Sequence, residues 1–199
     1  ADIVVKINRP LIDKNVNELV NFKNTKNFLS LFYPEKFTKE FNGLKKLKIN
    51  VFAMELMPRI SRAQSMDVLS SQSNLAGYKA VIDAASYYNK AFPLMMTSAG
   101  TIAPAKVLII GAGVAGLQAV ATAKRLGAVV FVFDVRAATK EQVESLGGNF
   151  IEVNDTGGSG ETAAGYAKEM SKSYKLKQAR LLEDNLSKMD VVICTCLLY

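Results

Sequence analysis

Three glycines at the end of an apolar run are the residues with the most specific chemistry. Lys106 to Gly116 reads KVLIIGAGVAG and contains the pattern G-x-G-x-x-G, formed by Gly111, Gly113 and Gly116. The first glycine of this pattern permits a sharp turn out of a strand, the second lets bare backbone approach a pyrophosphate, and the third lets a helix pack closely on the sheet. A helical pattern follows from Leu117 to Leu126. Its positive N-terminal end would face the phosphates, so we predict a dinucleotide-binding strand, turn and helix.

An acidic residue stands where such a site requires one. A second apolar run, Val129 to Phe133, ends in Asp134, 18 residues after Gly116. A carboxylate there accepts hydrogen bonds from the adenosine ribose and repels a 2′-phosphate, which favours NAD(H) over NADP(H). Arg136 weakens this inference because an arginine can accommodate a 2′-phosphate, although it could equally be a solvated charge that offsets Asp134. The predicted cofactor-binding residues of these two turns are Gly111, Ala112, Gly113, Val114, Gly116, Asp134, Val135 and Arg136.

Composition is that of an ordinary globular protein. The 199 residues are 49% hydrophobic and 22% charged, which suits one large domain or two small ones. The net charge of +7 comes from 25 basic and 18 acidic residues. A nucleic-acid groove would require clustered arginines with aromatic residues between them, and the sequence contains no such cluster, so we expect no nucleic-acid partner. Its longest apolar stretch, Val107 to Ala123, includes the three turn glycines, which favours a soluble core over a membrane span.

Cysteine and histidine usage argues against a metal site. The chain has no histidine and only two cysteines, Cys194 and Cys196, in the apolar run Val191 to Leu198. A metal site would require more ligands. Two residues apart in a strand, the cysteines are expected to share one face as small buried residues, and their scarcity weakly indicates a reducing compartment.

The remaining pattern predicts two α/β domains. Strands are expected at 1–7, 28–33, 49–55, 150–153 and 191–199, and the first of them is expected to be buried. Helices are expected at 35–47, 68–90, 139–146 and 166–186, a linker at 97–104, and a Gly-rich segment at 154–165. A capping box, Thr139-x-x-Gln142, should start the third of these helices. We predict the end of a first α/β domain at 1–66, a connecting helix and linker at 67–104, and a Rossmann-type parallel-sheet domain at 105–199. Because apolar strands open and close the sequence, we expect a fragment of a longer polypeptide.

The short polar segment Arg59 to Asp67 is unusual. It reads RISRAQSMD and introduces the long predicted helix. Ser61-x-x-Gln64 could be a capping box that starts this helix early, whereas Ser65 or Asp67 could cap it later. In a single helix, one face would carry a polar stripe suited to lining a cleft: Gln64, Asp67, Ser71 and Asn74.

Three segments together resemble a known family. Pro58 to Tyr78, Gly111 to Gly116 and Asp134 to Gly147 closely resemble the NAD(H)-binding component of proton-translocating NAD(P) transhydrogenases, in the alanine dehydrogenase/transhydrogenase family, and RISRAQSMD is the most diagnostic motif. The resemblance implies direct hydride transfer between NAD(H) on this component, domain I of the alpha subunit, and NADP(H) on another. A membrane component would move protons. Such chemistry needs no protein acid or base, so the lack of histidine is no obstacle.

The resemblance also implies residue roles. Arg59 would hold the carboxamide and phosphate side of the cofactor, Asp67 and Ser70 would fix the dihydronicotinamide and its ribose, and Gln64 would reach the incoming NADP(H). These roles place the start of the long helix near Asp67. Segment 157–166 matches a mobile loop of the family, in which Tyr166 would fold over the adenosine. The cofactor-binding residues implied there are Gly165, Tyr166 and Ala167.

Partners and location follow from the same resemblance. We expect an NADP(H)-binding domain and a transmembrane proton-channel domain of the same enzyme, a homodimer, and a soluble domain facing the cytosol or the mitochondrial matrix. The fragment alone is expected to be inactive. One alternative is an alanine dehydrogenase-like oxidoreductase, but that family works with a histidine in the region occupied here by Leu31 to Phe37, which has none. A noncatalytic NAD(H)-sensing module is the other alternative, and it would not need the polar groups of Arg59 to Asp67.

Overall fold

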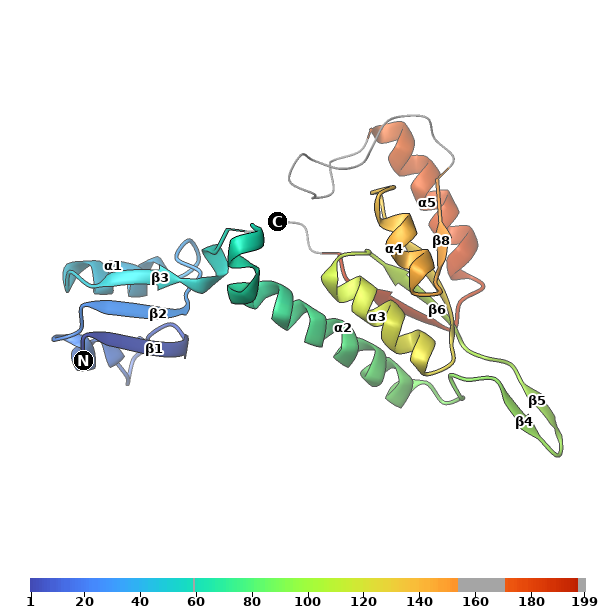
Figure 1. Cartoon of the computed structure of the whole chain (residues 1–199), viewed down its shortest axis with the longest axis horizontal. Helices are drawn as coiled ribbons and strands as arrows, with labels where there is room; N and C mark the ends of the chain where they lie inside the picture. The colour runs from blue at the N-terminus through green and yellow to red at the C-terminus, as the bar shows by residue number, and fades with distance from the viewer. Residues whose placement is uncertain (59, 154–170, 197–199) are drawn as a thin grey trace. The chain divides into compact units, whose positions relative to one another are not determined.

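The computed structural model describes residues 1–58, 60–153 and 171–196. The chain divides into two compact units, Ala1–Ser71 and Gln72–Tyr199, each with a parallel sheet and helices (Figure 1). The α/β class with a Rossmann-type sheet, predicted from the sequence, is confirmed. The sequence-based domain boundaries stay a prediction.

The first unit is a three-stranded parallel sheet with one helix against it. Its strands lie in the order β1-β2-β3. Phenylalanines 22, 28 and 32 form its core with Leu44 of the helix and Ile49. The elements are β1 (Ile3–Asn8), η1 (Glu18–Phe22), β2 (Asn27–Leu31), α1 (Thr38–Lys46), β3 (Asn50–Ala53), η2 (Met54–Leu56) and η3 (Ser61–Met66).

The first strand is more exposed than its apolar sequence predicted. The side chains of Ile3, Val5 and Ile7 are 58%, 72% and 80% exposed, so the prediction of a buried strand is wrong. These residues alternate along the strand and share one face of the sheet with Phe52, which is half exposed. The opposite face carries the fully buried Phe28. An apolar run predicts a strand. It does not predict which face of the sheet is buried by the other described residues.

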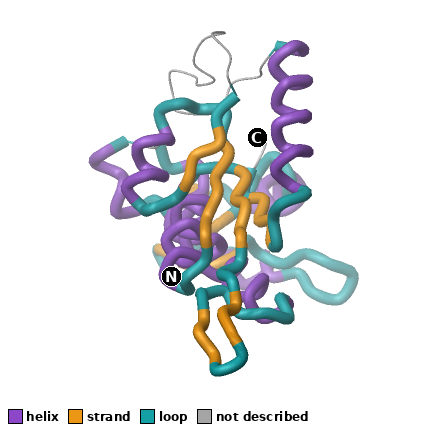
Figure 2. Tube along the Cα trace, turned by 90° about the vertical axis from the view of Figure 1, so that its right-hand side faces the viewer, coloured by secondary structure: helices purple, strands orange, loops and turns teal. Residues whose placement is uncertain are grey.

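The second unit contains a four-stranded parallel sheet in the order β8-β7-β6-β9. Helices flank the strands on either side (Figure 2). Strand order reverses between β6 and β9, and in open parallel sheets ligands bind beyond the carboxyl ends of the strands at such a reversal. The elements are β6 (Lys106–Ile110), α3 (Val114–Arg125), β7 (Val129–Phe133), α4 (Thr139–Ser145), β8 (Asn149–Ile151), α5 (Lys172–Leu186) and β9 (Val191–Cys194).

A long helix, α2 (Val68–Tyr87), packs on α3 in the second unit. A Cβ atom at Gly77 would lie 2.0 Å from the carbonyl oxygen of Ala115, so only glycine permits this close approach. Val81 is fully buried in the same core. The predicted start of this helix near Asp67 is confirmed, and the helix ends three residues before the predicted Lys90.

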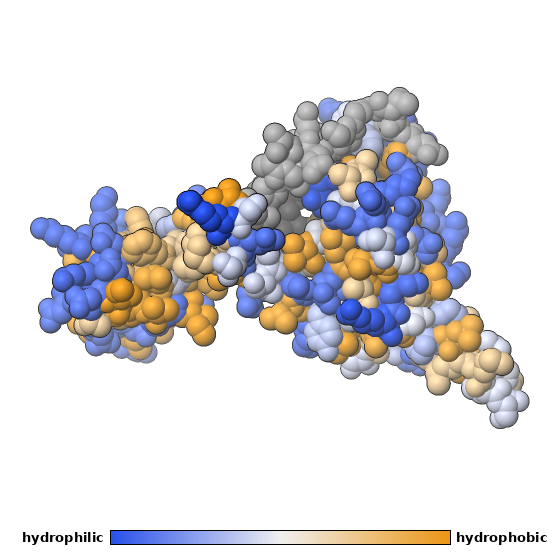
Figure 3. Space-filling model, viewed as in Figure 1, coloured by the Kyte–Doolittle hydropathy of each residue, from blue (hydrophilic) through white to orange (hydrophobic). Residues whose placement is uncertain are grey.

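The predicted linker at 97–104 is partly a β-hairpin. Strands β4 (Met95–Thr97) and β5 (Gly100–Ile102) pair antiparallel and project from the second unit with every residue exposed (Figure 1). Met96 is 84% exposed, and the hairpin presents apolar surface (Figure 3). Gly100, at a φ of 133°, supplies the backbone freedom that the turn requires.

Two further local predictions are wrong. Ala138 caps α4, while Thr139 lies inside the helix with its hydroxyl donating to the carbonyl of Arg136 at 2.8 Å, so the predicted capping box does not form. Cys194 and Cys196 are exposed rather than buried, because Cys194 lies on an uncovered face of β9 and Cys196 follows the strand's end. None of the helices in the described ranges combines the length and apolar character needed to cross a bilayer.

Candidate dinucleotide site

The glycine turn follows the most buried strand of the second unit. Three consecutive residues of β6, beginning with Val107, are fully buried. The chain then turns at Gly111, which has a φ of 102° and whose N–H donates to the carbonyl of Phe133 at 2.8 Å. Helix α3 begins at Val114, with Gly113 as its N-cap. Glycine has no side chain to satisfy the first amides of the helix, so these donors face the turn.

Each glycine of the motif meets different surroundings. A Cβ atom at Gly116 would lie 1.8 Å from the carbonyl oxygen of Gly111, so this glycine lets α3 cross close to the turn. At Gly113, a Cβ atom would meet no atom of the described residues within 4 Å. The described part of the chain therefore leaves space over Gly113, where a pyrophosphate would need bare backbone. The residues present fit a dinucleotide phosphate.

Asp134 lies directly beside the turn, at the end of β7. Its Oδ2 accepts from the N–H of Ala112 at 2.7 Å, and its Oδ1 accepts from the N–H of Arg136 at 2.8 Å. The Arg136 guanidinium also pairs with it, Nε to Oδ1 at 3.0 Å and Nη2 to Oδ2 at 2.9 Å. Burial would raise the pKa of Asp134, but the hydrogen bonds from Arg136 and Ala112 outweigh it and hold this pKa below its ordinary value. Asp134 is therefore an ionised acceptor next to the glycine turn.

The other residues of the predicted set surround these two turns. Ala112 is almost fully buried beneath the turn, Val114 is exposed at the first position of α3, and Val135 is half-buried between Asp134 and Arg136. The structure thus brings the predicted residues of the glycine turn and of the acidic turn together at the carboxyl ends of adjacent strands.

Two residues that no sequence motif singles out also contact the turn. The Thr195 hydroxyl lies 2.9 Å from the carbonyl oxygen of Gly111, and the Cys196 thiol donates to the carbonyl of Ile110 at 3.4 Å. Partial burial raises the pKa of the Cys196 thiol, and the nearby Asp134 carboxylate adds to this, so the thiol stays protonated at neutral pH. Both residues follow β9, and the pattern around them indicates only a strand.

Three of the residues predicted to act on the nicotinamide, Gln64, Asp67 and Ser70, belong to the first unit, which ends within the first turn of α2. Gln64 is exposed in η3, whereas Asp67 caps α2: its Oδ1 accepts from the N–H of Ser70 at 2.9 Å and its Oδ2 from the Ser70 hydroxyl at 2.6 Å. Asp67 itself is not helical, with φ −77° and ψ 87°. The predicted polar stripe through Gln64, Asp67, Ser71 and Asn74 is therefore wrong, because Gln64 and Ser71 belong to different helices.

Four predicted site residues lie outside the described residues. They are Arg59 in the RISRAQSMD segment and the residues of the predicted mobile loop: Gly165, Tyr166 and Ala167.

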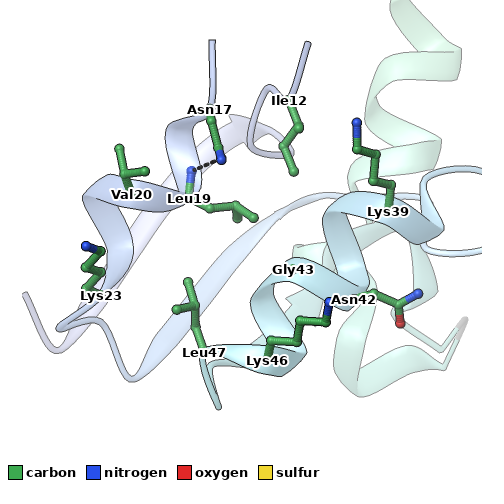
Figure 4. Close-up of a pocket in the computed structure, with 10 residues that line it drawn as sticks. All are labelled: Ile12, Asn17, Leu19, Val20, Lys23, Lys39, Asn42, Gly43, Lys46 and Leu47. Atoms are coloured by element: carbon green, nitrogen blue, oxygen red, sulfur yellow. Dashed lines mark hydrogen bonds between the residues drawn. The ribbon is translucent and has the colours of Figure 1, made fainter. Parts of the chain in front are cut away.

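The first unit also has a shallow groove of about 520 Å³ between η1 and α1 (Figure 4). Leu19 and Leu47 form its apolar floor, and three lysines stand around it: Lys23, Lys39 and Lys46. Gly43 lies at the contact, where a Cβ atom would lie 2.3 Å from the side chain of Leu19. The groove carries neither an acidic acceptor nor a glycine turn and has no role in the candidate site.

The parallel sheet with its strand reversal, glycine turn and acidic strand end defines a Rossmann-type dinucleotide-binding fold. Two family models describe the chain between them: "Alanine dehydrogenase/PNT, N-terminal domain" matches residues 1–76, and "Alanine dehydrogenase/PNT, C-terminal domain" matches residues 80–199. The chain belongs to the alanine dehydrogenase/PNT family.

Individual relatives agree with this assignment. The chain is 55% identical over 200 residues to a Rhodospirillum rubrum protein named as the first portion of NAD(P) transhydrogenase subunit alpha, covering 100% of this chain and 52% of the relative. A solved transhydrogenase from Sinorhizobium meliloti is 47% identical with a TM-score of 0.86, over 100% of this chain and 51% of that one. The chain therefore spans about half the length of these relatives. An L-alanine dehydrogenase structure, 22% identical over 75% of this chain and 42% of its own with a TM-score of 0.61, shares the fold.

Proposed function

We propose that this chain is the NAD(H)-binding component of a transhydrogenase, in which hydride passes directly between NAD(H) and NADP(H) held on a partner domain. One observation carries the proposal: the Gly111 to Gly116 turn is hydrogen-bonded to Asp134 in a chain 55% identical to a protein named as a transhydrogenase subunit. The hydrogen-bonded turn supports a dinucleotide whose ribose is not phosphorylated. The 55% sequence identity supports hydride transfer as the reaction.

The adenosine half of NAD(H) would lie at the second unit. The α3 N-terminus with Gly113 and Val114 would receive the pyrophosphate, and Asp134 would accept from the ribose hydroxyls. Arg136 already donates to both oxygens of this carboxylate, so the ribose would compete with the guanidinium for acceptor positions. In this proposal Gly165, Tyr166 and Ala167 cover the adenosine of bound NAD(H).

The nicotinamide half would lie at the segment Arg59 to Ser70. In this proposal Arg59 holds the carboxamide and phosphate side, Asp67 and Ser70 fix the dihydronicotinamide and its ribose, and Gln64 meets the NADP(H) side. The short hydrogen bond from the Ser70 hydroxyl to Asp67 holds these two side chains together at the start of α2. This supports a role for both as preplaced acceptors for the ribose and the dihydronicotinamide. Exposure of Gln64 leaves its amide accessible to a partner.

Bound NAD(H) supplies the hydride chemistry itself. The role left to this chain is to hold one ring at near-attack distance from the other and to exclude water, which requires orientation rather than a protein acid or base. A chain with no histidine can therefore fulfil this role.

We further propose that the complete protein works with an NADP(H)-binding domain and a transmembrane proton-channel domain, facing the cytosol or the mitochondrial matrix, and that this chain is inactive without them. A homodimer completes the proposal. The β4–β5 hairpin supports it, because an isolated two-stranded hairpin is marginally stable in water and this one exposes Leu94, Met95, Met96 and Ile102. A second copy would cover this apolar surface.

A transfer assay with the complete protein tests the reaction. NADPH, an oxidised NAD analogue and the NADP(H)-binding partner should yield reduced analogue, and omission of the partner should stop the reaction. Oxidation of NADH driven by pyruvate and ammonia, without transfer, would instead establish an alanine dehydrogenase. NADH binding with neither reaction would indicate a noncatalytic sensor.

A further inference from the structure

A threonine beyond β9 contacts the glycine turn from the opposite side to Asp134. Strand β9 pairs with β6 up to the pair Ile110 and Cys194, so the next residue, Thr195, arrives where β6 becomes the turn. The N–H of Thr195 donates to the carbonyl of Ile110 at 2.9 Å. Its hydroxyl lies 2.9 Å from the carbonyl oxygen of Gly111 and 3.2 Å from that of Ile110. A hydroxyl has one proton to donate, and Gly111 offers the nearer acceptor.

The register that delivers Thr195 is fixed at the other end of the strands. The N–H of Asp190 donates to the carbonyl of Lys106 at 2.9 Å, and the N–H of Lys106 donates to the Asp190 carboxylate at 2.8 Å. This bond from Lys106 holds the pKa of Asp190 below its ordinary value, so the carboxylate accepts throughout the neutral range. Strands β6 and β9 are thus tied together before and after their shared ladder.

One peptide unit of the turn is held from two sides. The carbonyl of the Gly111–Ala112 peptide faces the Thr195 hydroxyl, and the N–H of the same peptide donates to Asp134 at 2.7 Å. Because a peptide unit is planar, fixing its oxygen and its N–H fixes the orientation of the whole plane. The next residue is Gly113, over which the described residues leave open space.

The turn needs such support because Gly111 resists rotation poorly. Glycine populates positive φ as readily as negative φ, so the backbone at Gly111 lacks the steric preference that other residues have. Rotation of this peptide would replace the Ala112 N–H with a carbonyl oxygen facing the Asp134 carboxylate. That arrangement is repulsive and would misplace the backbone beside the phosphate position.

We propose that Thr195 is a positioning residue of the dinucleotide site, which acts by orienting the Gly111–Ala112 peptide rather than by touching the cofactor. This inference rests on the proposed function because it concerns the same NAD(H) site. It adds a residue from beyond β9, 84 positions away in sequence from the glycine that it contacts.

Binding of NADH to variants of the complete protein tests this role. Thr195→Val removes the hydroxyl and keeps the branched shape, Thr195→Ser keeps the hydroxyl, and Thr195→Ala is a second hydroxyl-free variant if valine prevents folding. The control is Thr122→Val, which removes a buried hydroxyl that donates to the Gln118 carbonyl at 2.8 Å within α3. We expect the dissociation constant for NADH to be roughly tenfold larger in the hydroxyl-free variants than in wild type. For Thr195→Ser and Thr122→Val it should stay within about twofold of wild type.

A double-mutant cycle separates positioning from general stability. If Thr195 and Asp134 hold one peptide, Asp134→Asn and Thr195→Val should weaken NADH binding less together than the sum of their separate effects. Fully additive effects, or unchanged binding in both hydroxyl-free variants, would overturn the role of Thr195 while leaving NAD(H) binding by the wild type intact. Failure of the wild-type protein to bind NADH would overturn both this inference and the proposed function.

Discussion

At Gly113, a substitution should affect protein stability and NADH binding to different extents. Among the residues that the structure describes, an alanine Cβ atom at this position would meet no atom within 4 Å, and its φ of −78° suits any residue. Because alanine is a poorer N-cap than glycine, Gly113→Ala should cost about 1 kcal/mol and lower the thermal midpoint of the complete protein by no more than about 4 °C. The methyl group would occupy the space proposed for the pyrophosphate, so NADH should bind at least tenfold more weakly, as measured by fluorescence titration.

Gly116→Ala is the matched control for this prediction. Its Cβ atom would lie 1.8 Å from the Gly111 carbonyl oxygen, so the thermal midpoint should fall clearly whether or not cofactor is present. If Gly113→Ala bound NADH as tightly as wild type, the pyrophosphate would have to lie elsewhere.

Asp134 should make stability depend on pH in acid. Its pKa is lowered in the folded state, so the stabilisation is fully present above the ordinary aspartate pKa of about 4 and is lost as the pH falls through the lowered value. Urea unfolding of the complete protein at pH 7, 5, 4 and about 2.5 should show wild type losing stability from about pH 4 downward. Asp134→Asn should lose less over the same interval. If Asp134→Asn and wild type lost the same free energy of unfolding, the ionised pair of Asp134 and Arg136 would be contradicted.

Sequence patterns predicted one side of the site and not the other. The glycines and Asp134 were predictable because a strand, a tight turn and a helix N-terminus require particular residues at fixed spacing. Thr195 was not, because its partners lie 84 and 85 residues away and its contact depends on β9 entering the sheet beside β6. Strand order is a property of the whole sheet and leaves no local signal.

At the scale of elements, the start of α2 tests whether Asp67 has a structural role, a functional role or both. Its carboxylate accepts from the N–H and hydroxyl of Ser70. Asp67→Ala should destabilise the complete protein by about 1 kcal/mol, the usual cost of losing an N-cap, whereas Asp67→Asn should restore most of that stability. Urea unfolding measures this difference.

Hydride transfer distinguishes the two roles. If Asp67 also fixes the dihydronicotinamide, Asp67→Asn should slow transfer at least tenfold despite its near-normal stability. Normal transfer by this variant would reduce Asp67 to a helix cap.

Element predictions succeeded where the local pattern and the packing agreed. The apolar runs of β6 and β7 predicted buried strands, and their residues Val107 and Val132 are fully buried. The pattern failed at β1, where one face is exposed, and at the predicted linker, where β4 and β5 pair. Short strands of three residues give too little periodicity to separate a hairpin from a connection.

At the scale of the whole molecule, the hairpin predicts how copies associate. Met96 is 84% exposed on β4, so a charge there should not disturb the unit that carries it. If a second copy covers the hairpin, Met96→Glu should shift the complete protein toward monomer in sedimentation experiments, because burying an unpaired carboxylate is costly. Leu176→Glu, at another exposed site on α5, should leave association unchanged. If Met96→Glu left dimerisation unaffected, the hairpin would not be part of the dimer interface.

Titration of the complete protein with NADH and with NADPH shows directly whether the site prefers the cofactor without a 2′-phosphate. An ionised Asp134 beside the glycine turn should favour the cofactor without a 2′-phosphate, so NADH should bind at least tenfold more tightly than NADPH, and Asp134→Asn should narrow this gap. If the wild-type protein bound NADPH as tightly as NADH, Asp134 would not select NAD(H) and the proposed NAD(H) site would be wrong.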